Sequence, residues 1–130
     1  MARILLAEDD DSVRAFVKRA LELDGNAVIA VEDGATALEI VGSDAGGFDL
    51  LVSDIKMPVM DGIALALNVA RDHPDLPILL MTGYADQRER AHGLDQIVRD
   101  VVSKPFTLAD FRRIVAATLA GVPEPTRLAG

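Results

Sequence analysis

The sequence predicts an α/β protein in which a parallel β-sheet is covered by helices on both faces. Short apolar segments alternate with segments whose apolar residues recur at helical spacing, and this happens five times along the 130 residues. The short segments are apolar almost throughout, which is typical of strands buried on both faces of a parallel sheet. Right-handed crossovers leave few topologies, and the favoured one is a doubly wound, flavodoxin-like sheet with strand order 2-1-3-4-5.

The first half of the chain provides two strand–helix pairs. Residues 3–7 form a short apolar run that predicts a buried strand. Residues 12–23 show helical spacing, with Asp11 or Ser12 as the candidate cap at the start and Gly25 as the candidate end. A second strand is expected over 27–31 and a second helix over 35–41.

The second half repeats the pattern three times. The third strand is the most apolar and is expected to be central. Strands are expected over 48–53, over 77–81 and within 97–103; helices are expected over 61–72, 85–94 and 108–119. The helix over 85–94 is more polar than the others, and its polar face is typical of a solvated helix surface.

Composition limits the class of protein. Residues 1–120 are expected to form one domain, and residues 121–130, which include Pro123 and Pro125, a flexible tail. There is no cysteine, so disulfides and thiolate metal sites are excluded. We expect a cytoplasmic protein without a signal peptide or membrane span, and the net charge of −8 argues against a general nucleic-acid or membrane surface.

Functional side chains are expected at the carboxyl ends of the strands, where doubly wound sheets bind their ligands. The residues that follow the strands are acidic, hydroxyl-bearing or basic: Glu8 and Asp9 after the first, Asp54 after the third, Thr82 and Gly83 after the fourth, and Lys104 after the fifth. Each is common in an ordinary loop, and the acidic run over residues 8–11 alone is more typical of a solvated loop with a helix cap. Their placement at successive strand ends of one sheet favours a functional site.

The chemistry of these residue types predicts a metal site. Three carboxylates in one pocket need positive charge to stay ionised together, and oxygen ligands suit Mg²⁺. With Mg²⁺ and Lys104 neutralising its oxygens, a phosphoryl group can approach Asp54, whose carboxylate would become an acyl phosphate. Thr82 would donate a hydrogen bond to the phosphoryl group, and Gly83 would leave room for it. The next two acids, Asp10 and Asp11, are expected to cap or guide the first helix.

Four strings carry a resemblance to a known family: ILLAEDD, LLVSDIKMPVMDG, LLMTGYA and VSKPF. They resemble the motifs of bacterial response-regulator receiver domains, the CheY-like fold, over residues 3 to about 120. The resemblance implies that Asp54 accepts a phosphoryl group from a histidine kinase or a histidine phosphotransfer protein. It also implies that Glu8, Asp9, Asp54 and the backbone carbonyl of Lys56 hold Mg²⁺, with contact from Glu8 either direct or through water.

The same resemblance assigns the remaining motif residues and exposes a departure from the family pattern at Val101. Thr82 and Lys104 would contact the phosphoryl group, and the peptide bond before Pro105 would be cis. The family's switch usually uses an aromatic residue where this chain has Val101, so Tyr84 is the candidate to report the phosphorylation state instead. Lys56 and Tyr84 also occupy positions that tune dephosphorylation, and their types predict slow loss of the phosphate.

The output is expected to be protein binding, because the sequence leaves no room for a DNA-binding domain. The residues of the motifs resemble those of a narrower group, the CpdR-like cell-cycle regulators of alphaproteobacteria. This resemblance implies a protease-adaptor role with the ClpX unfoldase as partner. The alternative is a pseudo-receiver that binds partners without being phosphorylated. A flavodoxin would need a neutral phosphate loop after the first strand, and a dehalogenase-type phosphatase would need an acid where Lys56 stands.

Overall fold

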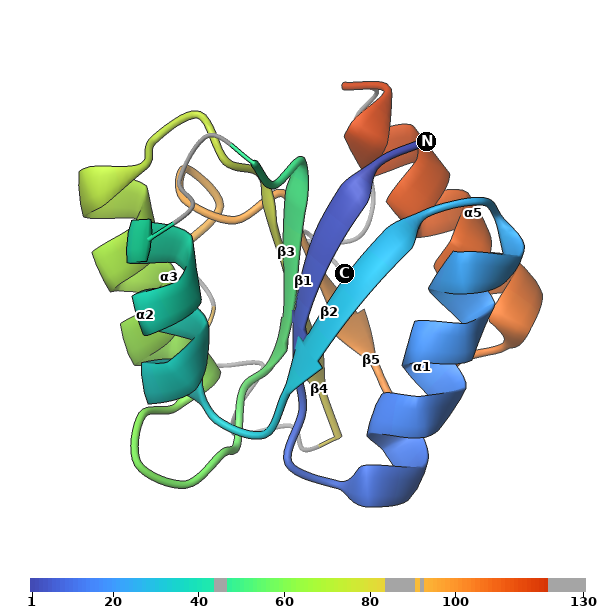
Figure 1. Ribbon diagram of the computed structural model, residues 1–130, viewed down its shortest axis with the longest axis horizontal. Coiled ribbons are helices and arrows are strands. Elements are labelled where there is room, and N and C mark those ends of the chain that lie inside the picture. Colours follow the sequence, from blue (N-terminus) through green and yellow to red (C-terminus); the bar gives the residue numbers. More distant parts are fainter. Residues whose placement is uncertain (44–46, 84–90, 92, 122–130) are drawn as a thin grey trace.

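The computed structural model describes residues 1–43, 47–83, 91 and 93–121 (Figure 1). Five parallel strands form one sheet in the order β2-β1-β3-β4-β5, as predicted. The strands are β1 (Arg3–Ala7), β2 (Ala27–Val31), β3 (Leu50–Asp54), β4 (Ile78–Thr82) and β5 (Asp100–Ser103). The helices in the described residues are α1 (Asp11–Leu23), α2 (Gly34–Ser43), α3 (Gly62–Asp72) and α5 (Leu108–Leu119).

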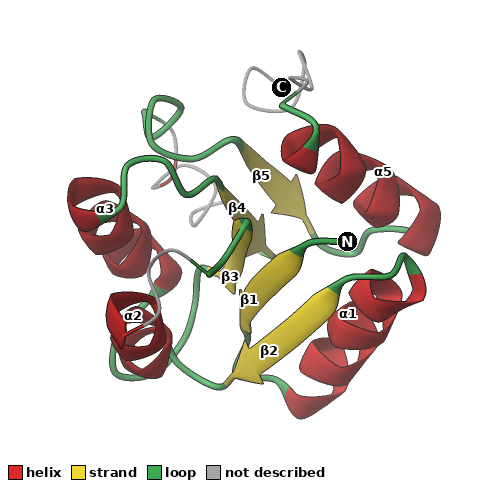
Figure 2. Ribbon diagram, turned by 45° about the horizontal axis from the view of Figure 1, so that its top comes forward, coloured by secondary structure: helices red, strands yellow, loops and turns green. Residues whose placement is uncertain are grey.

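The helices form a layer on each side of the sheet, with α2 and α3 on one face and α1 and α5 on the other (Figures 1 and 2). Successive strand residues point to opposite faces, so each strand feeds both cores. In β1, Leu5 packs in the core beneath α2 and α3, whereas Ile4 and Leu6 pack in the core beneath α1 and α5. This two-sided burial explains why β1, β3 and β4 are apolar almost throughout. The edge strand β2 is less covered, and Ile29 remains 41% exposed.

Several boundaries differ from the sequence prediction. Strand β3 ends at Asp54 rather than at residue 53, so Asp54 is the last residue of the strand. Neither Asp11 nor Ser12 caps α1, but the expectation that Asp10 caps or guides this helix is confirmed. The cap is Asp10, whose backbone is still extended and whose Oδ1 accepts a hydrogen bond of 3.0 Å from the Val13 N–H. The chain enters α1 sooner than predicted because an acid directly after the strand-end pair performs the capping.

Other predictions fall outside the described residues. Most of the helix expected over 85–94 lies outside the described residues, since 84–90 and 92 are not described. Tyr84 and the segment 122–130 also lie outside the described residues. Helix α5 has the predicted bounds. None of the helices in the described ranges is long and apolar enough to cross a membrane.

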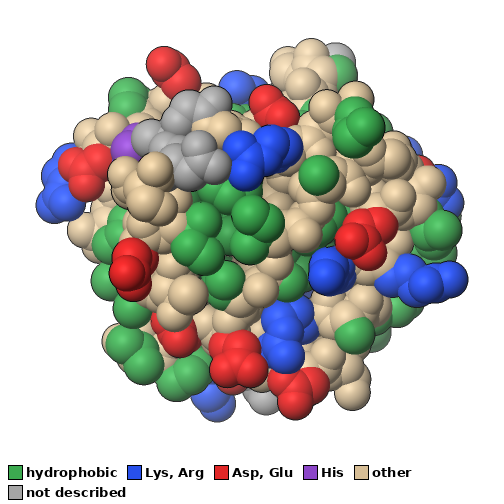
Figure 3. Space-filling view, in the orientation of Figure 1, with side chains coloured by type: hydrophobic (Ala, Val, Ile, Leu, Met, Phe, Trp, Pro, Cys, Tyr) green, Lys and Arg blue, Asp and Glu red, His purple; other side chains and the backbone are tan. Residues whose placement is uncertain are grey.

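Charges of both signs are interspersed on the face of the molecule shown in Figure 3. Among the ion pairs of the described residues, one joins Arg112 of α5 to Asp24, the residue that caps the carboxyl end of α1. This pair bridges two helices on the same side of the sheet, 88 residues apart in the sequence.

Candidate functional site

The register of the sheet brings the predicted site residues to one edge. Ala7 of β1 is paired with Ser53 of β3, so the next residues, Glu8 and Asp54, leave the sheet at the same level. Thr82 of β4 is paired with Ser103 of β5, so Gly83 and Lys104 follow at the next level. The carboxyl ends of β1, β3, β4 and β5 therefore meet at one edge of the sheet.

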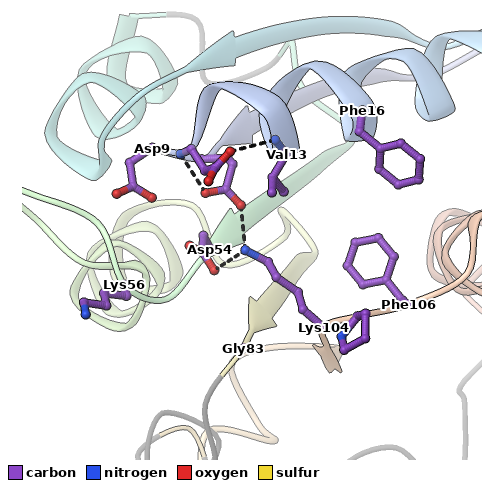
Figure 4. Close-up of a pocket in the computed structure, with 11 residues that line it drawn as sticks. Asp9, Val13, Phe16, Asp54, Lys56, Gly83, Lys104 and Phe106 are labelled. Atoms are coloured by element: carbon purple, nitrogen blue, oxygen red, sulfur yellow. Dashed lines mark hydrogen bonds and ion pairs between the residues drawn. The ribbon is translucent and has the colours of Figure 1, made fainter.

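Lys104 lies between two buried carboxylates (Figure 4). Its Nζ lies 2.8 Å from Glu8 Oε1 and 3.1 Å from Asp54 Oδ1. The Glu8 residue is fully buried and Asp54 is 6% exposed. The second oxygen of Glu8, Oε2, accepts a hydrogen bond of 3.1 Å from the backbone N–H of Asp10. Two negative charges thus share one ammonium group in a mostly dry environment.

Burial dominates the ionisation of the two acids. Loss of water raises the pKa of Glu8 from 4.5 to about 7, although hydrogen bonds from Lys104 and the Asp10 backbone oppose the change. Burial also raises the pKa of Asp54, again against the opposing charge of Lys104. For Lys104, burial disfavours the ammonium, but Glu8 and Asp54 outweigh it and raise the Lys104 pKa. At both acids, loss of water therefore outweighs the favourable contacts with Lys104.

Asp9 completes an acidic cluster at the mouth of the site. Its side chain is exposed, and one carboxylate oxygen each from Glu8, Asp9 and Asp54 lie within 4.8 Å of one another. Carboxylate oxygens are the ligands that Mg²⁺ prefers, and burial disfavours the ionised forms of Glu8 and Asp54, so a bound cation would stabilise them. The residues present therefore fit a divalent cation. Lys56 lines the same cleft.

The acidic cluster opens into a cleft of about 710 Å³. Beyond Lys104, the cleft has an apolar wall formed by Val13, Phe16, Pro105 and Phe106. In Figure 4, Phe16 of α1 and Phe106 lie away from Asp9, on the far side of Lys104. Phe16 follows the helical spacing of the apolar residues of α1, yet it is 48% exposed. The sequence therefore did not reveal this wall.

The structure also locates the other motif residues. Thr82 is 2% exposed at the end of β4, and its carbonyl oxygen accepts a hydrogen bond of 2.7 Å from the Lys104 backbone N–H. Gly83 lines the cleft. The Lys104–Pro105 peptide bond is cis, as the family resemblance implies. Val101 is 2% exposed within β5.

Arg14 is a residue that the sequence analysis did not connect with the site. Its Nη1 donates a hydrogen bond of 3.0 Å to the backbone carbonyl of Glu8, and its Nη2 lies 2.5 Å from Asp11 Oδ1. It therefore ties the first turn of α1 to the segment that carries the acids. The spacing of three residues from Asp11 on a helix was the signal that could have indicated the second contact.

The sequence matches the model of the response regulator receiver domain family over residues 4–116. The response regulator MprA of Mycobacterium ulcerans is 38% identical over 117 residues, which are 90% of this chain and 50% of that protein. The MprA of Mycobacterium tuberculosis is 37% identical over the same shares. The chain thus spans about half the length of the curated relatives it matches.

Solved structures show the same fold. A response regulator receiver domain protein from Clostridium thermocellum has a TM-score of 0.85 at 22% identity, covering 93% of this chain and 96% of that one. The receiver domain of nitrogen regulatory protein C has a TM-score of 0.81 at 31% identity, covering 92% and 95%. Both likenesses extend over nearly the whole sheet and the helices around it.

Proposed function

The chain belongs to the response regulator receiver domain family, and from this premise we propose that it accepts a phosphoryl group on Asp54 in a Mg²⁺-dependent reaction. One observation carries the proposal. Asp54 and Glu8 share the ammonium group of Lys104 at the mouth of an open cleft, with Asp9 beside them. This arrangement supports a role for Asp54 as the nucleophile, for the acidic cluster as a cation site and for Lys104 as the positive charge that meets the phosphoryl group.

The reaction we propose is the transfer of a phosphoryl group from a phosphodonor to the carboxylate of Asp54. A carboxylate oxygen of Asp54 attacks the phosphorus, a new P–O bond forms, and the bond from phosphorus to the donor's histidine nitrogen or acyl oxygen breaks. The donor leaves with the electron pair of that bond. A bound Mg²⁺ would neutralise the charge that the phosphoryl oxygens bring into the acidic pocket.

Each neighbouring residue has a role in this proposal. Glu8, Asp9 and Asp54, with the backbone carbonyl of Lys56, would hold the cation. Lys104 would exchange its contact with Asp54 for one with the phosphoryl group. Thr82 would hydrogen-bond that group from the end of β4, and Gly83 would leave room beside it. The support is the position of these residues at or next to neighbouring strand ends, and the cleft that all of them except Thr82 line.

The phosphodonor would be a histidine kinase or a histidine phosphotransfer protein of a two-component pathway. The output would be a change in a protein-binding surface, since the phosphoryl group can shift a population of conformers only through contacts that differ between them. We extend the proposal to a cytoplasmic cell-cycle role in which the ClpX unfoldase is bound, on the strength of the motif resemblance. Purified ClpX should bind wild type to an extent that depends on phosphorylation. In Asp54→Ala, that dependence should be lost.

Phosphorylation by acetyl phosphate tests the central proposal. Wild type and Asp54→Ala are incubated with acetyl phosphate, with MgCl₂ or with EDTA, and the intact mass is measured. We expect a gain of one phosphoryl group in wild type with MgCl₂ only. Asp72→Ala serves as the matched control, because Asp72 is an exposed acid paired with Arg71 at the carboxyl end of α3, away from the site; it should still be modified.

Two outcomes would contradict the proposal. Modification that persists in Asp54→Ala would move the acceptor to another residue. Wild type that binds MgCl₂ but gains no phosphoryl group and no beryllofluoride would favour the alternative, a pseudo-receiver that binds partners without being phosphorylated.

A further inference from the structure

The loop between β3 and α3, residues 55–61, contains a strained turn. Val59 has a φ of 69°, and the Met60 N–H donates a hydrogen bond of 2.8 Å to the Pro58 carbonyl across it. A β-branched residue in this three-residue turn is unfavourable. The side chain of Val59 is 86% exposed, so its own packing does not offset the strain. Contacts elsewhere must hold the loop in this shape.

One such contact lies at the end of the loop. The Gly62 N–H donates a hydrogen bond of 2.8 Å to the Ile55 carbonyl. A Cβ atom at Gly62 would lie 2.1 Å from the backbone carbonyl oxygen of Asp54 and 2.9 Å from its carbonyl carbon. The α3 end of the loop therefore closes directly on the backbone of Asp54, and only glycine permits that approach.

A second contact comes from a distant part of the chain. A Cβ atom at Gly34, the first residue of α2, would lie 2.4 Å from the carbonyl oxygen of Met60. The atoms approached at both glycines are backbone atoms, so they cannot swing aside as the end of a side chain would. The backbone of the loop at Met60 is therefore packed directly against the first residue of α2.

Two buried side chains, Ser53 at the end of β3 and Met57 in the loop, contact each other at the start of the loop. The Ser53 hydroxyl donates a hydrogen bond of 2.9 Å to the Asp54 carbonyl oxygen, the same oxygen that Gly62 approaches. The Met57 residue is 8% exposed, and its Sδ lies 4.0 Å from the Ser53 Oγ. Lys56 sits between these fixed points and lines the cleft.

We infer that Gly34 and Gly62 act as positioning residues that hold the loop 55–61, and with it the backbone of Asp54 and Lys56, in the shape that the cation site requires. The inference rests on the proposed function in so far as it assigns a Mg²⁺ site to Asp54 and the Lys56 carbonyl. Neither glycine touches the cation. A methyl group at either position would displace the loop and so move the ligands.

Calorimetric titration with MgCl₂ alone tests this role without relying on phosphorylation. We expect Gly62→Ala and Gly34→Ala to weaken Mg²⁺ binding about tenfold or more, the range found when groups supporting a metal's ligands are altered. Gly42→Ala is the matched control, because a Cβ there meets nothing within 4 Å. Val69→Ala, which empties a buried position of α3, controls for lost stability and should leave the dissociation constant unchanged.

Hydrogen exchange in the wild type keeps the inference testable if the glycine variants do not fold. The amides of Met60 and Gly62 should be protected in EDTA, because the glycine contacts form the loop before the cation arrives. Exchange of both amides at the rate of an open chain in EDTA would overturn the inference.

The titration also separates this inference from the proposed function. Wild type that binds no Mg²⁺ would refute the proposed function itself. Wild type that binds Mg²⁺, together with glycine variants that fold and bind it equally well, would refute only the positioning role. Weaker binding in the variants supports that role even if Asp54 is never phosphorylated.

Discussion

Two groups of charged side chains in this molecule are built in opposite ways. In the site, Glu8 and Asp54 are buried around Lys104, and burial raises the pKa of both acids. At the junction of α1 and α5, Asp24 pairs with Arg112 on the surface, and Arg112 lowers the pKa of Asp24. The surface pair is better off charged in the folded protein, whereas the buried acids are not. The site therefore opposes folding at neutral pH, which is expected of residues retained for binding and chemistry.

Removing the shared lysine should have the largest effect on stability. Lys104→Met leaves two buried carboxylates without their positive partner, which we expect to lower the free energy of unfolding by about 3 kcal/mol. Urea unfolding in EDTA measures this. Arg112→Met, which breaks the surface pair, should lower the free energy of unfolding by only a small fraction of that amount.

Added cation provides the control for this prediction. MgCl₂ should restore part of the stability of Lys104→Met, because a bound cation supplies the missing charge. If Lys104→Met and Arg112→Met lowered stability equally, the contrast between the two groups of charges would be wrong.

Removing one of the two buried charges should have the reverse effect. Asp54→Asn keeps the shape of the side chain and leaves one carboxylate for one ammonium, so we expect the free energy of unfolding to rise by about 1 to 2 kcal/mol in EDTA. The same variant should accept no phosphoryl group. Asp24→Asn, the corresponding change at the surface, should not stabilise the protein. A loss of stability in Asp54→Asn would show that Lys104 fully compensates both acids.

The sequence predicted the sheet order and the convergence of the strand ends, because both follow from apolar periodicity and the rules of parallel sheets. It did not predict how deeply Glu8 is buried, since burial depends on the packing of α1 against the sheet. It also missed the apolar wall at Phe16, because helical spacing alone cannot tell a core position from the rim of a cleft. The contact of Gly34 with Met60 joins segments far apart in the chain, and no local pattern indicates it.

The pH dependence of stability offers a finer test, since the two groups titrate in opposite senses. Glu8 has a pKa of about 7 in the folded protein and an ordinary value of 4.5, so between these values the folded state binds more protons than the unfolded state. Stability in EDTA should therefore fall as the pH rises through this window, and Asp54 should add to the fall. Glu8→Gln should flatten the slope in urea unfolding across the window. A slope that persisted in this variant would mean that other groups cause it.

The smallest effect is expected at the surface pair. The ordinary pKa of Asp24 is 3.8 and Arg112 lowers it, so the stabilising contribution of the pair is complete above 3.8 and is lost as the pH falls below that value through the folded pKa. Asp24→Asn should therefore differ from wild type above pH 3.8 and approach it below, while leaving the slope due to Glu8 unchanged. Because the pair is exposed, added NaCl should also reduce the difference, whereas the effect of Lys104→Met should respond much less to NaCl. Equal sensitivity to salt in the two variants would mean that the site is as hydrated as the surface, and burial could then not raise the pKa of Glu8 to about 7.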